Sequence, residues 1–238
     1  MKRYFKGVAK ALLAPFRNVR SQEFYPGKVF HDERLLSFSQ FGEDLVLDAF
    51  MGMPATGFYV DIGANDPLKL SNTHRFYLRG WHGINVEPDP LTFLRMETLR
   101  PRDINLNVGI ASKSGTLDFY RMSADSLSTF NRDAAFKAQS QYRERIVDIV
   151  PIQVRPLADV LSKYASNLDI DFLSVDVEGL DLEVLQSNDW NLHRPKLIVV
   201  EVNQGGKAID HFLQTISYAM LYNNGTNGIY SDTRYTRI

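Results

Sequence analysis

The sequence predicts an α/β fold with a doubly wound, mostly parallel sheet, and three observations indicate it. Short apolar runs alternate with stretches of helical length, as βαβ crossovers require. The runs are short and mainly apolar, which is typical of parallel strands buried on both faces. Four runs end in acidic residues, at the edge where open parallel sheets bind ligands. The predicted strands span residues 57–62, 83–87, 104–110, 170–177 and 196–202.

The composition fits one domain and excludes several classes of site. A chain of 238 residues with 44% hydrophobic content can bury the core of a single α/β domain. Its net charge of -1 gives no basic face for phosphates, so we expect no nucleic-acid partner. The absence of cysteine excludes disulfides and thiolate metal sites. Because no apolar run is long enough to span a bilayer, we expect a cytoplasmic protein.

Residues 1–36 form an extension that differs from the α/β domain predicted over 37–238. The first twenty residues contain six Lys or Arg and no acid, and apolar residues recur there at helical spacing. This pattern indicates a basic amphipathic helix. Such a helix can pack on its own domain, on a partner subunit of a homodimer, or on a membrane surface as a peripheral contact. The sequence leaves these alternatives open.

The remaining elements follow in order. A first helix is predicted after Ser39, which can act as its cap, within SQFGEDLVLDAFMG. An insertion after the third strand, about 116–154, contains two strands around a polar segment and is expected beside the ligand. A last helix leads into an antiparallel hairpin that turns near 223–225. The helices between the strands are predicted at 72–79, 90–99, 156–164 and 180–186.

The loop after the first strand predicts a nucleoside site. Asp61 ends the strand, Gly63 lets the backbone pass close to a ligand, and Asn65 offers a polar side chain. Glu87 lies at the end of the second strand, where a carboxylate accepts hydrogen bonds from ribose hydroxyls. Both NAD and S-adenosylmethionine fit so far. The dinucleotide fingerprint G-x-G-x-x-G is absent, and an acid at Asp61 suits a cationic methyl donor better than a pyrophosphate.

Several spaced passages give the chain a resemblance to a known family. SQFGEDLVL, GFYVDIGANDP, GWHGINVEPDP, RPRDINLNVGIASKSGTLDFY and DFLSVDVEGLDLEVL occur in order within roughly residues 37–203. With them the chain resembles the FkbM-type methyltransferases, which are S-adenosylmethionine-dependent O-methyltransferases found with polysaccharide and antibiotic biosynthesis. The resemblance implies a Rossmann-like class I methyltransferase domain. One departure is Ser174, where many members carry a lysine, so a role for that lysine is not expected here.

The resemblance also implies roles for individual residues. Asp61, Gly63 and Asn65 would contact the methionine and ribose parts of the donor, and Glu87 would hold the ribose hydroxyls. Asp176 and Glu178 would face the sulfonium and the acceptor. Methyl transfer requires a group that removes a proton from the acceptor hydroxyl, and Asp176 is the first candidate, with Glu178 second.

A metal ion is the competing design for the acceptor side. Asp176, Glu201 and Asn203 are oxygen ligands at adjacent strand ends and could hold Mg²⁺, which would lower the pKa of the acceptor hydroxyl. The same acids are otherwise explained as a base and a helix cap, so the metal site is left unassigned. His74 and His82 lie near the donor loop and are weaker candidates for the base.

Taken together, the sequence predicts an S-adenosylmethionine-dependent O-methyltransferase. The expected acceptor is a sugar hydroxyl in glycan, polysaccharide or natural-product biosynthesis, and this expectation depends on the resemblance alone. The alternatives are an NAD-dependent oxidoreductase of Rossmann type and a non-catalytic nucleoside-binding scaffold.

Overall fold

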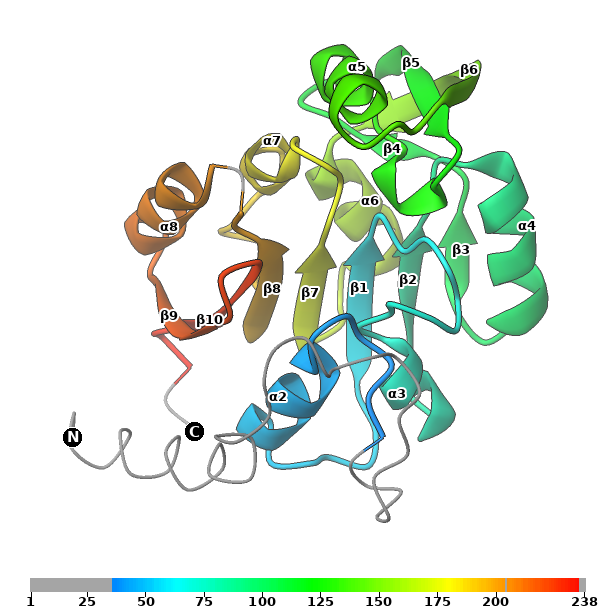
Figure 1. Ribbon diagram of the computed structural model, residues 1–238. Helices are drawn as coiled ribbons and strands as arrows, with labels where there is room; N and C mark the ends of the chain where they lie inside the picture. Colours follow the sequence, from blue (N-terminus) through cyan, green and yellow to red (C-terminus); the bar gives the residue numbers. More distant parts are fainter. Residues whose placement is uncertain (1–35, 204, 236–238) are drawn as a thin grey trace.

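The computed structural model describes residues 36–203 and 205–235. Its centre is a seven-stranded sheet in the order β3-β2-β1-β7-β8-β10-β9 (Figure 1). The predicted doubly wound, mostly parallel sheet is therefore confirmed. Its strands are β1 (Phe58–Ile62), β2 (His82–Val86), β3 (Ile104–Leu106), β7 (Phe172–Val175), β8 (Leu197–Glu201), β9 (Tyr218–Asn223) and β10 (Asn227–Asp232).

The strand order reverses beside β1. The chain proceeds from β1 to β2 and β3 on one side, and returns to place β7 and β8 on the other. These five strands are parallel, with Val60 of β1 opposite Ile84 of β2 and Leu173 of β7. β10 pairs antiparallel with β8, and β9 closes this end as the predicted hairpin. A reversal of this kind opens a crevice at the carboxyl ends of the strands.

Helices cover both faces of the sheet (Figure 1). On one face, α2 (Glu43–Phe50) and α3 (His74–Leu78) pack on an aromatic cluster that includes Tyr59 and Phe172. On the other face, aliphatic side chains of the sheet pack against three helices. Burial of each large apolar side chain contributes about 1.5–3 kcal/mol to the stability of the fold. These helices are α6 (Leu157–Tyr164), α7 (Asp181–Gln186) and α8 (Gly206–Thr215), while α4 (Pro90–Leu99) joins β2 to β3.

The first helix begins later than the sequence predicts. Its N-cap position is Gly42, whose positive φ of 88° suits glycine, and the helix starts at Glu43. Ser39 is not the N-cap residue, although its hydroxyl oxygen accepts a hydrogen bond from the Asp44 backbone N–H at 3.2 Å. Ser39 thus bonds to the first turn of the helix from a position three residues before the N-cap, because residues 39–42 turn back toward the helix end.

The predicted third strand, 104–110, is two strands. β3 remains in the main sheet, whereas β4 (Gly109–Ile110) leaves it and joins a second sheet. The break lies at Asn107, whose side-chain amide donates hydrogen bonds to the carbonyl oxygens of Glu87 and Pro88, at 2.9 Å each. The sequence of residues 104–110 does not reveal this change of direction, since the break depends on carbonyl oxygens about twenty residues away.

The segment after β4 forms a small subdomain above the strand ends (Figure 1). Its sheet has the order β4-β6-β5, with β5 (Gly115–Met122) antiparallel to β6 (Ile146–Arg155). The polar stretch between them contains a short 3-10 helix, Asp125–Leu127, and α5 (Arg132–Gln141), which the sequence analysis did not predict. Asn131 caps α5 by accepting from the Asp133 and Ala134 backbone N–H groups.

The predicted basic helix lies outside the described residues, which include only residue 36 of the N-terminal extension. Among the residues that the structure describes, no helix is long and apolar enough to cross a membrane.

Candidate active site

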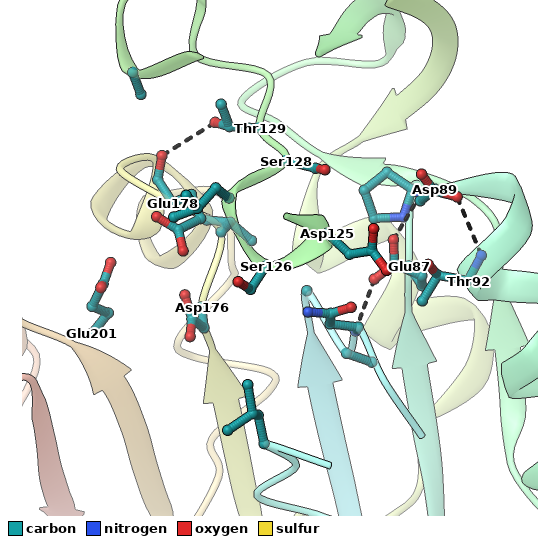
Figure 2. Close-up of a pocket in the computed structure, with 18 of the residues that line it drawn as sticks. Glu87, Asp89, Thr92, Asp125, Ser126, Ser128, Thr129, Asp176, Glu178 and Glu201 are labelled. Carbon is teal, nitrogen blue, oxygen red and sulfur yellow. Dashed lines mark hydrogen bonds between the residues drawn. The ribbon is translucent and has the colours of Figure 1, made fainter. Parts of the chain in front are cut away.

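A cavity of about 560 Å³ lies at the carboxyl ends of β1, β2, β7 and β8, beneath the insertion. The four predicted strand-end acids, Asp61, Glu87, Asp176 and Glu201, all line it, as do Gly63, Asn65 and Glu178. The structure thus brings together every residue that the sequence analysis assigned to donor or acceptor. Figure 2 shows Glu87, Asp176 and Glu201 at the strand ends, with Ser126 of the insertion above Asp176.

Gly63 is required by packing within the protein. Its φ is +79°, and a Cβ atom placed on it would lie 1.9 Å from the carbonyl oxygen of Asp176. No side chain fits there, so the loop after β1 can lie directly against the loop after β7 only through glycine. The sequence analysis attributed the glycine to close approach of a ligand, whereas the observed close approach is to the Asp176 backbone.

Glu87 is buried and organises the loops on the donor side. Its Oε2 accepts a hydrogen bond from the Asn65 backbone N–H at 2.8 Å, and its Oε1 accepts one from the Asp89 backbone N–H at 2.6 Å. Asn65 itself has a positive φ of 46°, in the left-handed region where asparagine is tolerated. Burial raises the pKa of Glu87 to about 7, although the two N–H groups oppose the shift.

Asp61 is held by a chain of buried hydroxyl groups. Its Oδ2 accepts a hydrogen bond from the Thr73 hydroxyl at 2.9 Å, and the Thr73 and Ser71 hydroxyl oxygens are 3.2 Å apart. Ser71 in turn accepts from Arg100, whose side chain is fully buried. Burial raises the pKa of Asp61, whereas the hydroxyls of Thr73 and Ser174 lower it. Ser71 and Thr73 lie in one short passage, Ser71-Asn72-Thr73, but nothing in the sequence links that passage to Asp61 or to Arg100.

The carboxylates of Asp176, at the end of β7, and of Glu178, in the loop that follows, lack such support from the described residues. No described residue donates a hydrogen bond to the carboxylates of Asp176 or Glu178. The Asp176 side chain is exposed to the cavity, and protein atoms surround that cavity. Burial raises the pKa of Asp176 well above its usual range, and the charges of Glu201 and Glu178 raise it further. Burial, with Glu201 and Asp181, raises the pKa of Glu178 to about 7.

Glu178 is held in an unusual backbone conformation. Its φ of 55° is in the left-handed region, followed by Gly179 at 96°. Strain of this kind costs on the order of 1 kcal/mol and persists where neighbours enforce it. Here the Thr129 hydroxyl of the insertion donates to the Glu178 carbonyl oxygen at 3.1 Å (Figure 2). The insertion and the Glu178 loop are therefore directly connected.

The insertion also provides residues that the sequence analysis missed. Lys137 of α5 and Tyr142 at the C-terminal end of α5 line the cavity. Arg121 of β5 forms a salt bridge with Asp89, which follows β2, at 2.5 Å. An Asn followed by helix-forming residues, as in Asn131 to Gln139, was the available signal for α5. In contrast, His74 and His82 do not line the cavity, so neither is placed to act as the base.

The predicted metal ligands are arranged differently from the expectation. Asn203 lines the cavity, but its side-chain amide donates to Glu201 Oε1 at 2.6 Å. The carboxylates that come together are instead those of Asp176, Asp181 and Glu201, with one oxygen of each within 4.8 Å of the others. Asp181, at the start of α7, accepts hydrogen bonds from the Val177 and Gly179 backbone N–H groups.

Sequence comparison decides between the candidate nucleoside-binding families. The profile of the Methyltransferase FkbM domain matches residues 61–223, which is more than half of the chain. The chain belongs to the FkbM methyltransferase family. It is accordingly an S-adenosylmethionine-dependent methyltransferase, and the oxidoreductase alternative is not favoured. No curated protein matches the sequence significantly.

Solved structures similar to this FkbM methyltransferase share little sequence with it. The N-terminal domain of human METTL16 has a TM-score of 0.46 at 10% identity, covering 97% of this chain and 81% of that one. A TehB-like SAM-dependent methyltransferase from Corynebacterium glutamicum has a TM-score of 0.42 at 12% identity, covering 98% and 100%. An O-methyltransferase from Bacillus cereus, in complex with SAH, has a TM-score of 0.40 at 13% identity, covering 95% and 88%.

The charge of the cavity determines what this methyltransferase can bind there. Lys137 is the only lysine or arginine among the described residues that line it. Two like charges about 5 Å apart repel by roughly 3 kcal/mol at an effective dielectric constant near 20, so a cation in the cavity is stabilised and an anion is repelled. The carboxylates that line the cavity are those of Asp61, Glu87, Asp89, Asp125, Asp176, Glu178 and Glu201.

Proposed function

We propose that this methyltransferase transfers the methyl group of S-adenosylmethionine to a sugar hydroxyl in glycan, polysaccharide or natural-product biosynthesis. The observation that carries the proposal is the excess of carboxylates over lysine in the cavity. S-adenosylmethionine has a sulfonium and an ammonium cation, which such a cavity stabilises. The pyrophosphate of NAD would be repelled and would find no G-x-G-x-x-G loop to supply amide groups.

In the proposed pose, Glu87 binds the ribose and the loop after β1 binds the methionine part. Each Glu87 oxygen accepts one backbone N–H, and each retains a second lone pair for a ribose hydroxyl. Asp61, Gly63 and Asn65 line the same part of the cavity. Because β1 and β7 are adjacent strands, a donor held at β1 and β2 directs its methyl group toward Asp176.

The acceptor is proposed to bind between the strand ends and the insertion. Asp125, Ser126 and Ser128 supply short polar side chains that can hydrogen-bond several hydroxyls. Tyr142, 64% exposed at the cavity edge, offers an aromatic face on which the C–H face of a sugar ring can pack. A ligand with many hydroxyls and no negative charge suits this combination.

In the reaction, the acceptor oxygen attacks the methyl carbon from the side opposite sulfur. The C–O bond forms as the C–S bond breaks, and the hydroxyl proton passes to the carboxylate of Asp176 or Glu178. The products are a methyl ether and S-adenosylhomocysteine. A carboxylate is normally a weak base, but burial raises the pKa of both residues, which makes each a better proton acceptor near neutral pH.

Calorimetric titration with S-adenosylhomocysteine tests the donor site. We expect Asp61→Ala and Glu87→Ala each to weaken binding at least about tenfold, which is a loss of roughly 1.4 kcal/mol. Asp118→Ala is the matched control, because Asp118 is exposed on β5 and does not line the cavity. Circular dichroism would establish that each variant is folded. Unchanged titration curves for both cavity variants would overturn the assignment.

The acceptor class needs a separate experiment. The enzyme would be incubated with isotopically labelled S-adenosylmethionine and with free, nucleotide-linked and polymeric sugars, followed by mass spectrometry of the products. We expect an O-methyl ether on a sugar, with uncharged acceptors preferred. Transfer to a nucleobase or a protein in place of every sugar would contradict the proposal.

A further inference from the structure

Three carboxylates at the ends of β7 and β8 and the start of α7 lie close enough to share one cation. One oxygen each of Asp176, Asp181 and Glu201 lies within 4.8 Å of the others. Two oxygen ligands on opposite sides of a hard divalent cation are separated by about 4–5 Å. The three side chains therefore need at most small rotations to bind the same ion.

An unpartnered buried atom points to a ligand at this position. Glu201 is only 7% exposed, and its Oε2 has no hydrogen-bond partner among the described residues, while Oε1 accepts from Asn203. A buried carboxylate oxygen without a partner is unfavourable, so such atoms are rare in folded proteins. The neighbouring Asp176 carboxylate also accepts no hydrogen bond from the described residues. Both groups face the cavity in Figure 2.

Among the described residues, no lysine or arginine at the strand ends compensates for the charge of this group. Lys137 is the only described lysine or arginine on the cavity wall, and it lies on α5 of the insertion rather than at the strand ends. Glu178, on the same wall, adds a further carboxylate. Carboxylate oxygens in this number are the ligands that hard divalent cations prefer.

We propose that Asp176, Asp181 and Glu201 bind one hard divalent cation, Mg²⁺ or Mn²⁺, beside the acceptor hydroxyl. The proposal deepens the proposed function and rests on it, because the cation would lie where the acceptor oxygen meets the methyl group. An acceptor oxygen bound to the cation loses its proton more easily. Asp176 would then act as a ligand, and Glu178, which is outside the group of three, would receive the proton.

Direct cation binding tests this proposal without any acceptor. The full chain, treated with a chelator and then desalted, would be titrated with Mn²⁺ and free Mn²⁺ followed by electron paramagnetic resonance. We expect one saturable site, competition by Mg²⁺, and at least about tenfold weaker binding for Glu201→Gln. The control is Asp125→Asn, which changes a cavity carboxylate on the insertion and is expected to leave Mn²⁺ affinity unchanged. Asp181→Asn provides a second cluster variant if Glu201→Gln does not fold.

Two titrations on the same sample separate this proposal from the proposed function. Binding of S-adenosylhomocysteine without saturable Mn²⁺ binding would overturn the cation site and leave the donor site intact. Failure of the wild-type chain to bind S-adenosylhomocysteine would overturn the proposed function, whatever Mn²⁺ does. Equal Mn²⁺ affinity in the wild type and both cluster variants would also overturn the cation site.

Discussion

The cavity has a donor half at the ends of β1 and β2 and an acceptor half at the ends of β7 and β8, and the carboxylates of the two halves differ in their hydrogen bonding. At the ends of β1 and β2, the carboxylates of Asp61 and Glu87 accept hydrogen bonds from protein groups at 2.6–2.9 Å. Beyond the end of β7, Asp176 and Glu178 accept none from the described residues, and at the end of β8 only Oε1 of Glu201 accepts one, from Asn203. The donor carboxylates are therefore preorganised by the protein, whereas Asp176 and Glu178 on the acceptor side have no hydrogen-bond donor among the described residues and are open to one from a bound ligand.

The largest predicted effect comes from Gly63, the point at which the two halves touch. In Gly63→Ala, the new Cβ would lie 1.9 Å from the Asp176 carbonyl oxygen, at a φ that disfavours alanine. We expect the loops after β1 and β7 to separate, with a loss of on the order of 3 kcal/mol in the free energy of unfolding. Binding of S-adenosylhomocysteine would fall below detection. Urea denaturation and calorimetry measure the two effects.

A second glycine provides the control for this prediction. Gly115, at the start of β5, has no atom within 4 Å of an added Cβ and no positive φ. Gly115→Ala should therefore change the unfolding free energy by less than about 0.5 kcal/mol. If Gly63→Ala changes the unfolding free energy as little as Gly115→Ala does, close contact between Gly63 and the Asp176 carbonyl oxygen does not hold the two loops together.

The next prediction concerns the pH dependence of the donor half. Burial raises the pKa of Glu87 from its ordinary 4.5 to about 7, so between these values the folded protein holds a proton that the unfolded chain releases. This group stabilises the fold in acid, and the contribution is lost as the pH rises through 7. Without ligand, Tm should fall less steeply between pH 5 and pH 8 in Glu87→Gln than in the wild type. Parallel Tm curves from scanning calorimetry would contradict this account.

A smaller effect is expected from the hydroxyl that supports Asp61. Thr73→Val keeps the shape of the side chain and removes the donor of the 2.9 Å hydrogen bond. We expect a loss of about 1 kcal/mol in stability and roughly threefold to tenfold weaker binding of S-adenosylhomocysteine. Thr98→Val, on the exposed side of α4, is the matched control. Equal affinities for the two variants would show that the hydroxyl chain does not position Asp61.

The sequence was sufficient for the main sheet and for the acids, because both follow from local pattern. Apolar runs mark parallel strands, and carboxyl ends of adjacent strands must meet at one edge. It was insufficient where the cause lies far along the chain. The break at Asn107 depends on the carbonyl oxygens of Glu87 and Pro88, and the support of Asp61 depends on Thr73, Ser71 and Arg100.

The candidate site shows the same division. The strand-end acids could be predicted to share a cavity, but spacing alone grouped Asp176 and Glu201 with Asn203. The structure groups them with Asp181, because Asp181 folds back to accept the Val177 and Gly179 N–H groups. A helix-capping carboxylate and a ligand look identical in a sequence. The roles of these residues stay predictions that only binding and turnover can test.

The most direct test of the contrast between the halves uses two ligands that differ at one group. Sinefungin carries an ammonium group where S-adenosylmethionine carries the methyl-bearing sulfonium, whereas S-adenosylhomocysteine is neutral there. With chelator present, the account predicts that the wild type binds sinefungin about tenfold more tightly, a gain of roughly 1.4 kcal/mol from the unpartnered carboxylates. In a variant with both Asp176→Asn and Glu178→Gln, this preference should disappear while S-adenosylhomocysteine still binds. Equal affinities in the wild type, or a preference that survives both substitutions, would contradict the account.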